Sequence, residues 1–221
     1  QALTGDLDTA KAGLGDLAKL AKGFNVDLDK MVGAAGQVGS AIGEVGEGKT
    51  FATAEEKAKA ILDVMKSITA HGQEGAIEVA DQVSQMAKLK ASGAAFEGST
   101  AENIKKMSAM AQLSLQLGGS ASATQAATSV MGFVSTLKTP ARRSQFKAMG
   151  VDIDSATEKG AFADPFEIIR RSLAKTQGDP EKMKKLFGNV VGERAVTALT
   201  NTYNKAGGGK AGMDAVEDQF K

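Results

Sequence analysis

The sequence predicts an all-α fold: an array of amphipathic helices with a coiled-coil-like segment at the N-terminus and no sheet. Three observations support this prediction. Apolar residues recur every three or four positions along most of the chain, which is the spacing of one helix face. Helix-capping residues and glycines stand between these stretches. Nowhere do apolar and polar residues alternate for long enough to form a half-buried strand.

The composition narrows the chemistry that this chain can perform. Its 27 basic and 26 acidic residues nearly cancel, so the charge gives no reason to expect a specific nucleic-acid ligand. The sequence has no cysteine, which excludes disulfides, thiolate nucleophiles and cysteine-ligated zinc. His71 is the only histidine, so a zinc site with two imidazoles is excluded as well. We expect no metal, no cofactor and no catalytic site in these residues.

Residues 1–48 form the coiled-coil-like segment. Apolar side chains alternate steps of four and three over about six heptads, a spacing that keeps one helix face turned toward a partner. The alternative is an amphipathic helix that lies on the protein's own core and breaks near Gly23 and beyond Gly43. We expect the face to join several copies of the chain. Its largest residues, here called the seam, are Leu3, Leu7, Leu14, Leu17, Phe24 and Leu28.

Residues 49–136 are predicted to form helical hairpins. Three pairs of residues have the capping-box spacing, in which two side chains satisfy backbone donors of the first helical turn. They are Thr53 with Glu56, Ser99 with Glu102, and Ser122 with Gln125. Glycine-containing turns are expected between helices of about 17 to 20 residues. These turns fall at His71-Gly72, between Gly93 and Gly98, and at Gly118-Gly119.

Residues 137–205 have the most regular series of helix-start signals. Each of the three prolines follows a residue that can cap a helix, and the fixed φ and missing N–H of proline suit the first helical position. Helices are therefore predicted to start at Pro140, Pro165 and Pro180. The apolar period after Pro180 continues through Gly188, which is expected to be a bend or a close contact. Residues 206–221 read as a glycine-rich joint and the start of another helix.

Short sequence motifs, here called phrases, lie between these helix starts in a fixed order. The first helix ends in FKAMGV, an acidic loop follows, and the third helix carries LFG. This order resembles the core region of tail tape measure proteins of long-tailed phages and related tail-like particles, where an LK.LGV-like phrase precedes an acidic loop and an LFG-like phrase. Met149 stands in the leucine position. The residues that carry the resemblance, expected to pack in the core, are Pro140, Phe146, Gly150, Val151, Gly160, Pro165, Leu186, Phe187 and Gly188.

The resemblance covers roughly residues 100 to 205 and implies a structural virion protein, not an enzyme. Tape measure proteins are long helical chains that set tail length during assembly, occupy the tail lumen or tip, and leave at genome ejection. The implied partners are other copies of the chain, tail tube and tail-tip or hub proteins, tail assembly chaperones and, on ejection, the host membrane. The implied location is the virion tail, with the host cytoplasm during assembly. We expect this chain to be a fragment of a longer one.

A competing hypothesis comes from the stretch Gly43 to Thr50, which satisfies the P-loop spacing G-x-x-x-x-G-K-T. In a nucleotide-binding enzyme, Gly43 and Gly48 would shape the loop, Lys49 would reach the phosphates and Thr50 would bind Mg²⁺. A P-loop follows a buried strand, however, whereas the residues before Gly43 keep a helical period. We therefore interpret the stretch as a glycine-rich hinge between two helices.

A third hypothesis is a membrane-active helical protein that uses the segment Met31 to Gly46. The uncharged part of this segment, Met31 to Gly43, would rise only about 20 Å as a helix, against a hydrocarbon core of about 30 Å. Membrane spanning by this segment is therefore not expected. Asp152, Asp154 and Glu158 could suggest a calcium loop, but they lack the ligand spacing of an EF-hand.

Overall fold

The computed structural model describes residues 7–74, 78–188 and 190–219, and across these residues the chain is all-α, as predicted. The described ranges contain twelve helices and no strand, and extended segments meet only in isolated bridges. The chain divides into two compact units, Gln1–Ala94 with Gly98–Ser108, and Ala95–Glu97 with Ala109–Lys221. The predicted segment 49–136 therefore contributes to both units.

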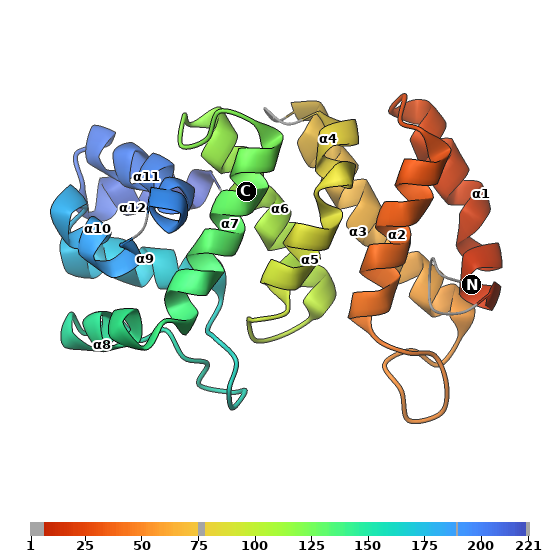
Figure 1. The fold of residues 1–221 in the computed structure, drawn as a ribbon, viewed down its shortest axis with the longest axis horizontal. Coiled ribbons are helices and arrows are strands. Elements are labelled where there is room, and N and C mark those ends of the chain that lie inside the picture. Colours follow the sequence, from red (N-terminus) through yellow and green to blue (C-terminus); the bar gives the residue numbers. More distant parts are fainter. Residues whose placement is uncertain (1–6, 75–77, 189, 220–221) are drawn as a thin grey trace. The chain divides into compact units, whose positions relative to one another are not determined.

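The first unit packs five helices and the start of α6 (Thr100–Gln116) around one apolar core (Figure 1). Met31, Met65, Ile68 and Ile104 are fully buried in this core, which is built from flexible and branched side chains. The five helices are α1 (Leu7–Gly23), α2 (Leu28–Ile42), α3 (Ala54–Glu74), α4 (Val79–Ser84) and α5 (Met86–Gly93).

The coiled-coil-like character predicted for the helical segment 1–48 is not confirmed, and the chain turns back between α1 and α2. Asn25 adopts a left-handed conformation with φ of 52°, which stops the first helix. Asp27 then caps the second helix, accepting hydrogen bonds from the N–H groups of Asp29 at 3.0 Å and Lys30 at 3.2 Å. The alternative interpretation, a helix that breaks near Gly23 and lies on its own core, describes this region better.

The seam is only partly buried. Leu17 is 5% exposed and packs in the core of the first unit, and Phe24 packs partly against it. Three seam residues remain on the surface, and they are Leu7 at 52%, Leu14 at 49% and Leu28 at 41% exposed. Leu3 lies outside the described residues.

Helix boundaries in the middle of the chain differ from the prediction in two places. Helix α3 continues past His71 to Glu74, and the His71 side chain lies outside the described residues. The helical stretch before Gly93 is divided at Gln85 into the short helices α4 and α5.

The capping box at Thr53 is confirmed, since Thr53 Oγ1 accepts from Glu56 N at 3.2 Å and Glu56 Oε2 accepts from Thr53 N at 3.3 Å.

The second unit starts its helices where the prolines predict. Pro140, Pro165 and Pro180 are the first residues of α8, α9 and α10. Asp164 and Asp179 cap α9 and α10, each accepting from two backbone N–H groups of the first turn. The helices of this unit beyond α6 are α7 (Ala123–Lys138), α8 (Pro140–Ala148), α9 (Pro165–Thr176), α10 (Pro180–Phe187), α11 (Val190–Lys205) and α12 (Gly209–Asp218).

Of the two alternatives for Gly188, the bend is wrong, because this glycine ends a helix, and the close contact is confirmed, because a Cβ here would collide with the Arg142 guanidinium. Gly188 is the C-cap of α10, with φ of 37°, and α11 begins at Val190. Its left-handed conformation lets its N–H bond back to Lys184 O at 2.7 Å and close the last turn. The apolar period runs through this point because both helices turn apolar residues toward the interior of the same unit, as Leu186 and Leu199 show.

Candidate functional site

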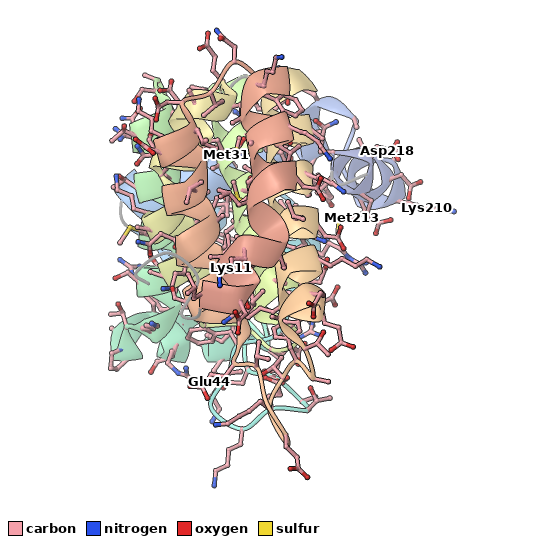
Figure 2. The ribbon with its side chains drawn as sticks, turned by 90° about the vertical axis from the view of Figure 1, so that its right-hand side faces the viewer. Lys11, Met31, Glu44, Lys210, Met213 and Asp218 are labelled. Atoms are coloured by element: carbon pink, nitrogen blue, oxygen red, sulfur yellow. The ribbon has the colours of Figure 1, made fainter. Side chains whose placement is uncertain are left out.

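The P-loop-like stretch is a closed loop between α2 and α3. Phe51 N–H donates to Glu44 O at 3.1 Å, Gly46 N–H donates to Phe51 O at 3.0 Å, and Lys49 N–H donates to Gly46 O at 3.1 Å. Figure 2 shows Glu44 on this loop, beyond the ends of the helices. Lys49 Nζ lies 2.7 Å from Glu44 Oε2, and this hydrogen-bonded ion pair raises the pKa of Lys49 and lowers that of Glu44.

This geometry differs from that of a phosphate-binding loop in three respects. A helix precedes the loop where a P-loop has a strand, and α3 begins at Ala54 and not at the Lys-Thr pair. Two backbone N–H groups of the loop, those of Gly46 and Lys49, bond within it instead of facing an open cradle. A Cβ at Gly43 would collide with the Thr50 side chain, so Gly43 closes the loop, while Gly48 has φ of 71° and open space around it. The stretch is a tight connection between helices.

Two residues of the family-like phrases, Phe146 and Phe187, lie in the aromatic core of the second unit. Phe146 and Phe187 are fully buried, and their rings meet edge to face at 5.2 Å. Phe133 stacks on Phe187 at 5.7 Å, and Phe96 stacks on Phe133 at 6.2 Å and contacts Phe162 at 6.0 Å. Offset and edge contacts at these spacings stabilise a core beyond the area that they bury.

The other phrase residues divide between core and surface. Val151, Leu186 and Pro165 are buried, as expected. Pro140, Gly150 and Gly160 are exposed, so their expected core position is wrong. They act on the backbone instead, since Pro140 starts a helix and the two glycines adopt positive φ of 68° and 90°.

Arg142 fastens α8 to the carbonyl end of α10. Its Nη1 donates to Lys185 O at 2.6 Å and to Gln145 Oε1 at 2.8 Å, and its Nη2 donates to Gly188 O at 2.9 Å. Helix C-termini leave unpaired carbonyls with partial negative charge, which a guanidinium satisfies well. These contacts give the arginine a fixed structural role.

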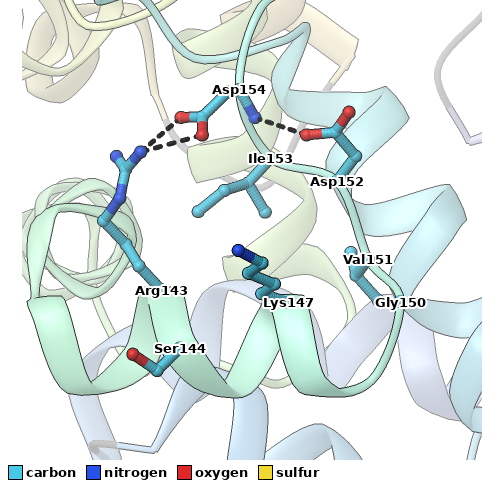
Figure 3. Close-up of a pocket in the computed structure, with 8 residues that line it drawn as sticks. All are labelled: Arg143, Ser144, Lys147, Gly150, Val151, Asp152, Ile153 and Asp154. Carbon is cyan, nitrogen blue, oxygen red and sulfur yellow. Dashed lines mark hydrogen bonds and ion pairs between the residues drawn. The ribbon is translucent and has the colours of Figure 1, made fainter.

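Arg143 holds the loop between α8 and α9. Its Nη2 donates to both carboxylate oxygens of Asp154, at 2.6 and 2.8 Å (Figure 3). Its guanidinium carbon lies 5.6 Å from the centre of the Phe162 ring. Arg171 Nη1 donates to Asp152 O at 3.0 Å from α9. Asp154 is thus committed to an ion pair, and no group of three acidic or histidine side chains within the described ranges could hold a metal ion.

The extended segment Ala95–Glu97 also holds this loop in place, a contact that the sequence pattern does not predict. Glu97 N–H donates to Phe162 O at 2.8 Å, and Phe162 N–H donates to Ala95 O at 3.0 Å. The Glu97 carboxylate accepts from the hydroxyls of Ser155 and Thr157, the latter at 3.0 Å, and these bonds lower the pKa of Glu97. A lone Phe96 between Gly93 and Gly98 was the available signal, since an aromatic residue in a linker needs a place to bury.

Two hollows lie on the surface of the second unit. The first, of about 620 Å³, lies between α8 and the loop Gly150–Asp154, and Arg143, Ser144 and Lys147 line its helical side (Figure 3). The second, also of about 620 Å³, lies beside the glycine-rich joint, with Tyr203 and Lys210 among its lining residues. Tyr203 Oη accepts from Gly209 N–H at 2.9 Å there and fixes the start of α12.

The apolar face of the segment proposed for membrane activity is buried. Met31, Ala35 and Val38 of α2 have no exposed surface and face the core of the first unit. Among the residues described, no helix combines the length and the apolar character that crossing a bilayer requires.

Three comparisons with known proteins found no similar protein. No protein-family model matches the chain, and neither a curated protein nor a solved structure is significantly similar to it.

Proposed function

We propose that this chain is a structural part of a virion tail, a folded region of a protein of the tail tape measure type. One observation supports this proposal above the others. The phrases whose order resembles that family supply Phe146, Val151, Leu186 and Phe187, which are all buried in the second unit. An order of motifs shared with a family is expected where each motif occupies a defined place in one core.

The polar contacts of the same region fit a structural role. The guanidinium groups of Arg142 and Arg143 are held by the end of α10 and by Asp154, and the Glu97 carboxylate is held by two hydroxyls. Charged groups that already hold each other in fixed positions stabilise one arrangement of loop and helices.

A ruler function would belong to other regions of the parent chain. A helix rises 1.5 Å per residue, so α3, the longest described helix with 21 residues, spans about 32 Å. Short helices that fold back on one another measure no tail length. In this proposal the region anchors the tape measure, and its surfaces contact neighbouring copies or tail-tip proteins.

The exposed part of the seam is the proposed contact between copies. Leu7 and Leu14 are seven residues apart on α1, so they lie on one face of this helix, about two turns apart, and each is about half exposed. Large apolar side chains that recur on one exposed helix face are typical of helix-to-helix association.

A tail-assembly assay tests the proposal in the particle-producing host. The substitution Phe187→Asp places a charge in the aromatic core of the parent protein, and Lys159→Gln at an exposed loop position is the matched control. We expect Phe187→Asp to yield particles without tails or with tails of irregular length under negative-stain electron microscopy, and the control to yield normal tails. Normal tails with a Phe187→Asp chain that is demonstrably unfolded would contradict the proposal.

A further inference from the structure

The large apolar side chains that stay exposed divide between the two units. Leu7 and Leu14 lie on α1 and Leu28 begins α2, and all three belong to the first unit. Among the described residues of the second unit, the exposed one is Met131 of α7, at 41%. Each unit therefore presents its own apolar surface, one on α1 and the other on α7.

The exposed face of α7 carries no charge. Four exposed residues with helical spacing form this neutral face, and they are Thr124, Thr128, Met131 and Ser135. From Met107 to Leu137 the sequence has no charged residue, although 24% of the chain is charged. The Thr128 hydroxyl donates to Thr124 O at 2.8 Å, so a partner that covers the face leaves this donor satisfied. Exposed helix faces normally carry charged groups, whereas the centres of protein interfaces are depleted of charge and enriched in methionine.

The exposed face of α1 carries one charge between two leucines. Lys11 follows Leu7 by four residues and precedes Leu14 by three, so the three residues lie on one side of the helix, here called the leucine face. The ion pair of Lys11 with Asp8 is long, at 4.0 Å, and joins two largely exposed side chains. Such a pair contributes little to stability, and Lys11 remains a positive charge at the centre of the leucine face.

Two leucine faces do not suit each other. In a parallel pair of α1 helices each leucine meets its own equivalent, and Lys11 faces Lys11 of the second copy. In an antiparallel pair Leu7 meets Leu14 of the second copy, and the two Lys11 residues again lie side by side, because Lys11 lies near the midpoint between the leucines. Like charges placed together at a contact oppose association. The neutral face presents no such charge, and the methylene stem of Lys11 can lie along Met131 while its ammonium stays in water.

We propose that copies of this chain associate head to tail, with the leucine face of one copy on the neutral face of the next. This inference rests on the contact between copies proposed above and names the second surface of that contact. The small side chains around Met131 leave space into which Leu7 and Leu14 can insert. A net charge of +1 does not keep the copies apart. Each copy then uses both of its faces once, a heterologous contact that extends into a ring or a filament.

The test blocks one face at a time in the purified chain and measures sedimentation velocity over a range of concentrations. Leu14→Asp blocks the leucine face and Met131→Asp blocks the neutral face, and both side chains are exposed, so we expect the fold to be kept. Each variant alone should associate at least about tenfold more weakly than the wild type, because the contact would bury a carboxylate. An equimolar mixture of the two should form heterodimers that grow no further, because each pair has one intact leucine face and one intact neutral face.

Two further variants separate the face from the added charge. Ala211→Asp places the same charge at an exposed position of α12, outside both faces, and should associate as the wild type does. Thr128→Asp, at another exposed position of the neutral face, should behave as Met131→Asp does. Circular dichroism of each variant checks that its helices are intact.

Three results would overturn the proposal. The first is association of Met131→Asp and Thr128→Asp at the strength of the wild type, which would assign the contact to another surface. The second is an equimolar mixture of Leu14→Asp and Met131→Asp that stays monomeric. The third is a wild-type chain that is monomeric at every concentration, which would remove the contact between copies altogether. Because the test uses the purified chain without particles, none of these results depends on whether the chain resides in a virion tail.

Discussion

Alanine at Gly188 should destabilise the second unit by about 2 kcal/mol, in two separable parts. The left-handed φ of 37° costs an L-residue about 1 kcal/mol. A Cβ would also stand where the Arg142 guanidinium lies, so the guanidinium must leave the carbonyls of Lys185 and Gly188. Loss of a cation at a helix C-terminus costs about 1 kcal/mol more.

The two parts are separated by a double-mutant cycle with Arg142→Ala. Without the guanidinium, Gly188→Ala should cost only the backbone part, about 1 kcal/mol, which gives a coupling of about 1 kcal/mol between the two positions. Gly160→Ala is the matched control, since Gly160 has φ of 90° and open space around its Cα. It should cost about 1 kcal/mol in either background.

The assay is urea unfolding followed by tyrosine fluorescence. Tyr203 is the only tyrosine, the chain has no tryptophan, and Tyr203 is buried in the second unit, so its emission reports on this unit alone. An equal cost of Gly188→Ala with and without Arg142 would refute the reasoning, because it would show that the guanidinium does not hold the end of α10.

Three further predictions follow from contacts described above. Hydrogen bonds keep the pKa of Glu97 below its ordinary value of 4.5 in the folded chain, so the stability that this carboxylate contributes is present above pH 4.5 and is lost as the pH falls through the folded pKa. Glu97→Gln should therefore flatten this part of the plot of unfolding free energy against pH, measured by urea unfolding. A plot identical to that of the wild type would contradict the prediction. Neither the wild-type chain nor Lys49→Ala should bind a fluorescent ATP analogue. Saturable binding by the wild type that Lys49→Ala abolishes would restore the nucleotide hypothesis. Leu17→Asp should unfold the first unit in circular dichroism, whereas Leu14→Asp should keep the fold and reduce self-association in analytical ultracentrifugation; equal sedimentation of Leu14→Asp and wild type would contradict the proposed contact between copies.

The sequence predicted most reliably where local chemistry decides the structure. Pro165 and Pro180 start helices because the preceding Asp164 and Asp179 satisfy the first backbone donors, an interaction that depends on neighbouring residues only. The all-α class followed from the helical apolar period for the same reason.

Periodicity failed where two helices share one core. The seam continues through the turn at Asn25 because α1 and α2 pack on the same apolar interior, and the apolar period continues through Gly188 for the corresponding reason in the second unit. A repeated spacing records which face is buried and does not show whether the helix is continuous.

The contacts of the candidate site could not be predicted from the sequence, because they join residues that are far apart in it. Phe96 and Phe162 are 66 positions apart, and the Glu97 carboxylate meets Ser155 across 58. Nothing local marks Arg142 as the partner of Gly188 rather than of solvent. Only the packed fold brings these side chains together.

The proposed role in a virion tail is tested most directly by locating the chain in particles. Tailed particles purified from the producing host would be digested and analysed by mass spectrometry before and after genome ejection. We predict peptides of this chain at a fixed copy number in intact particles and a strong loss of them after ejection. Their recovery only from the cytoplasm of the host, with none in intact tailed particles, would contradict the account.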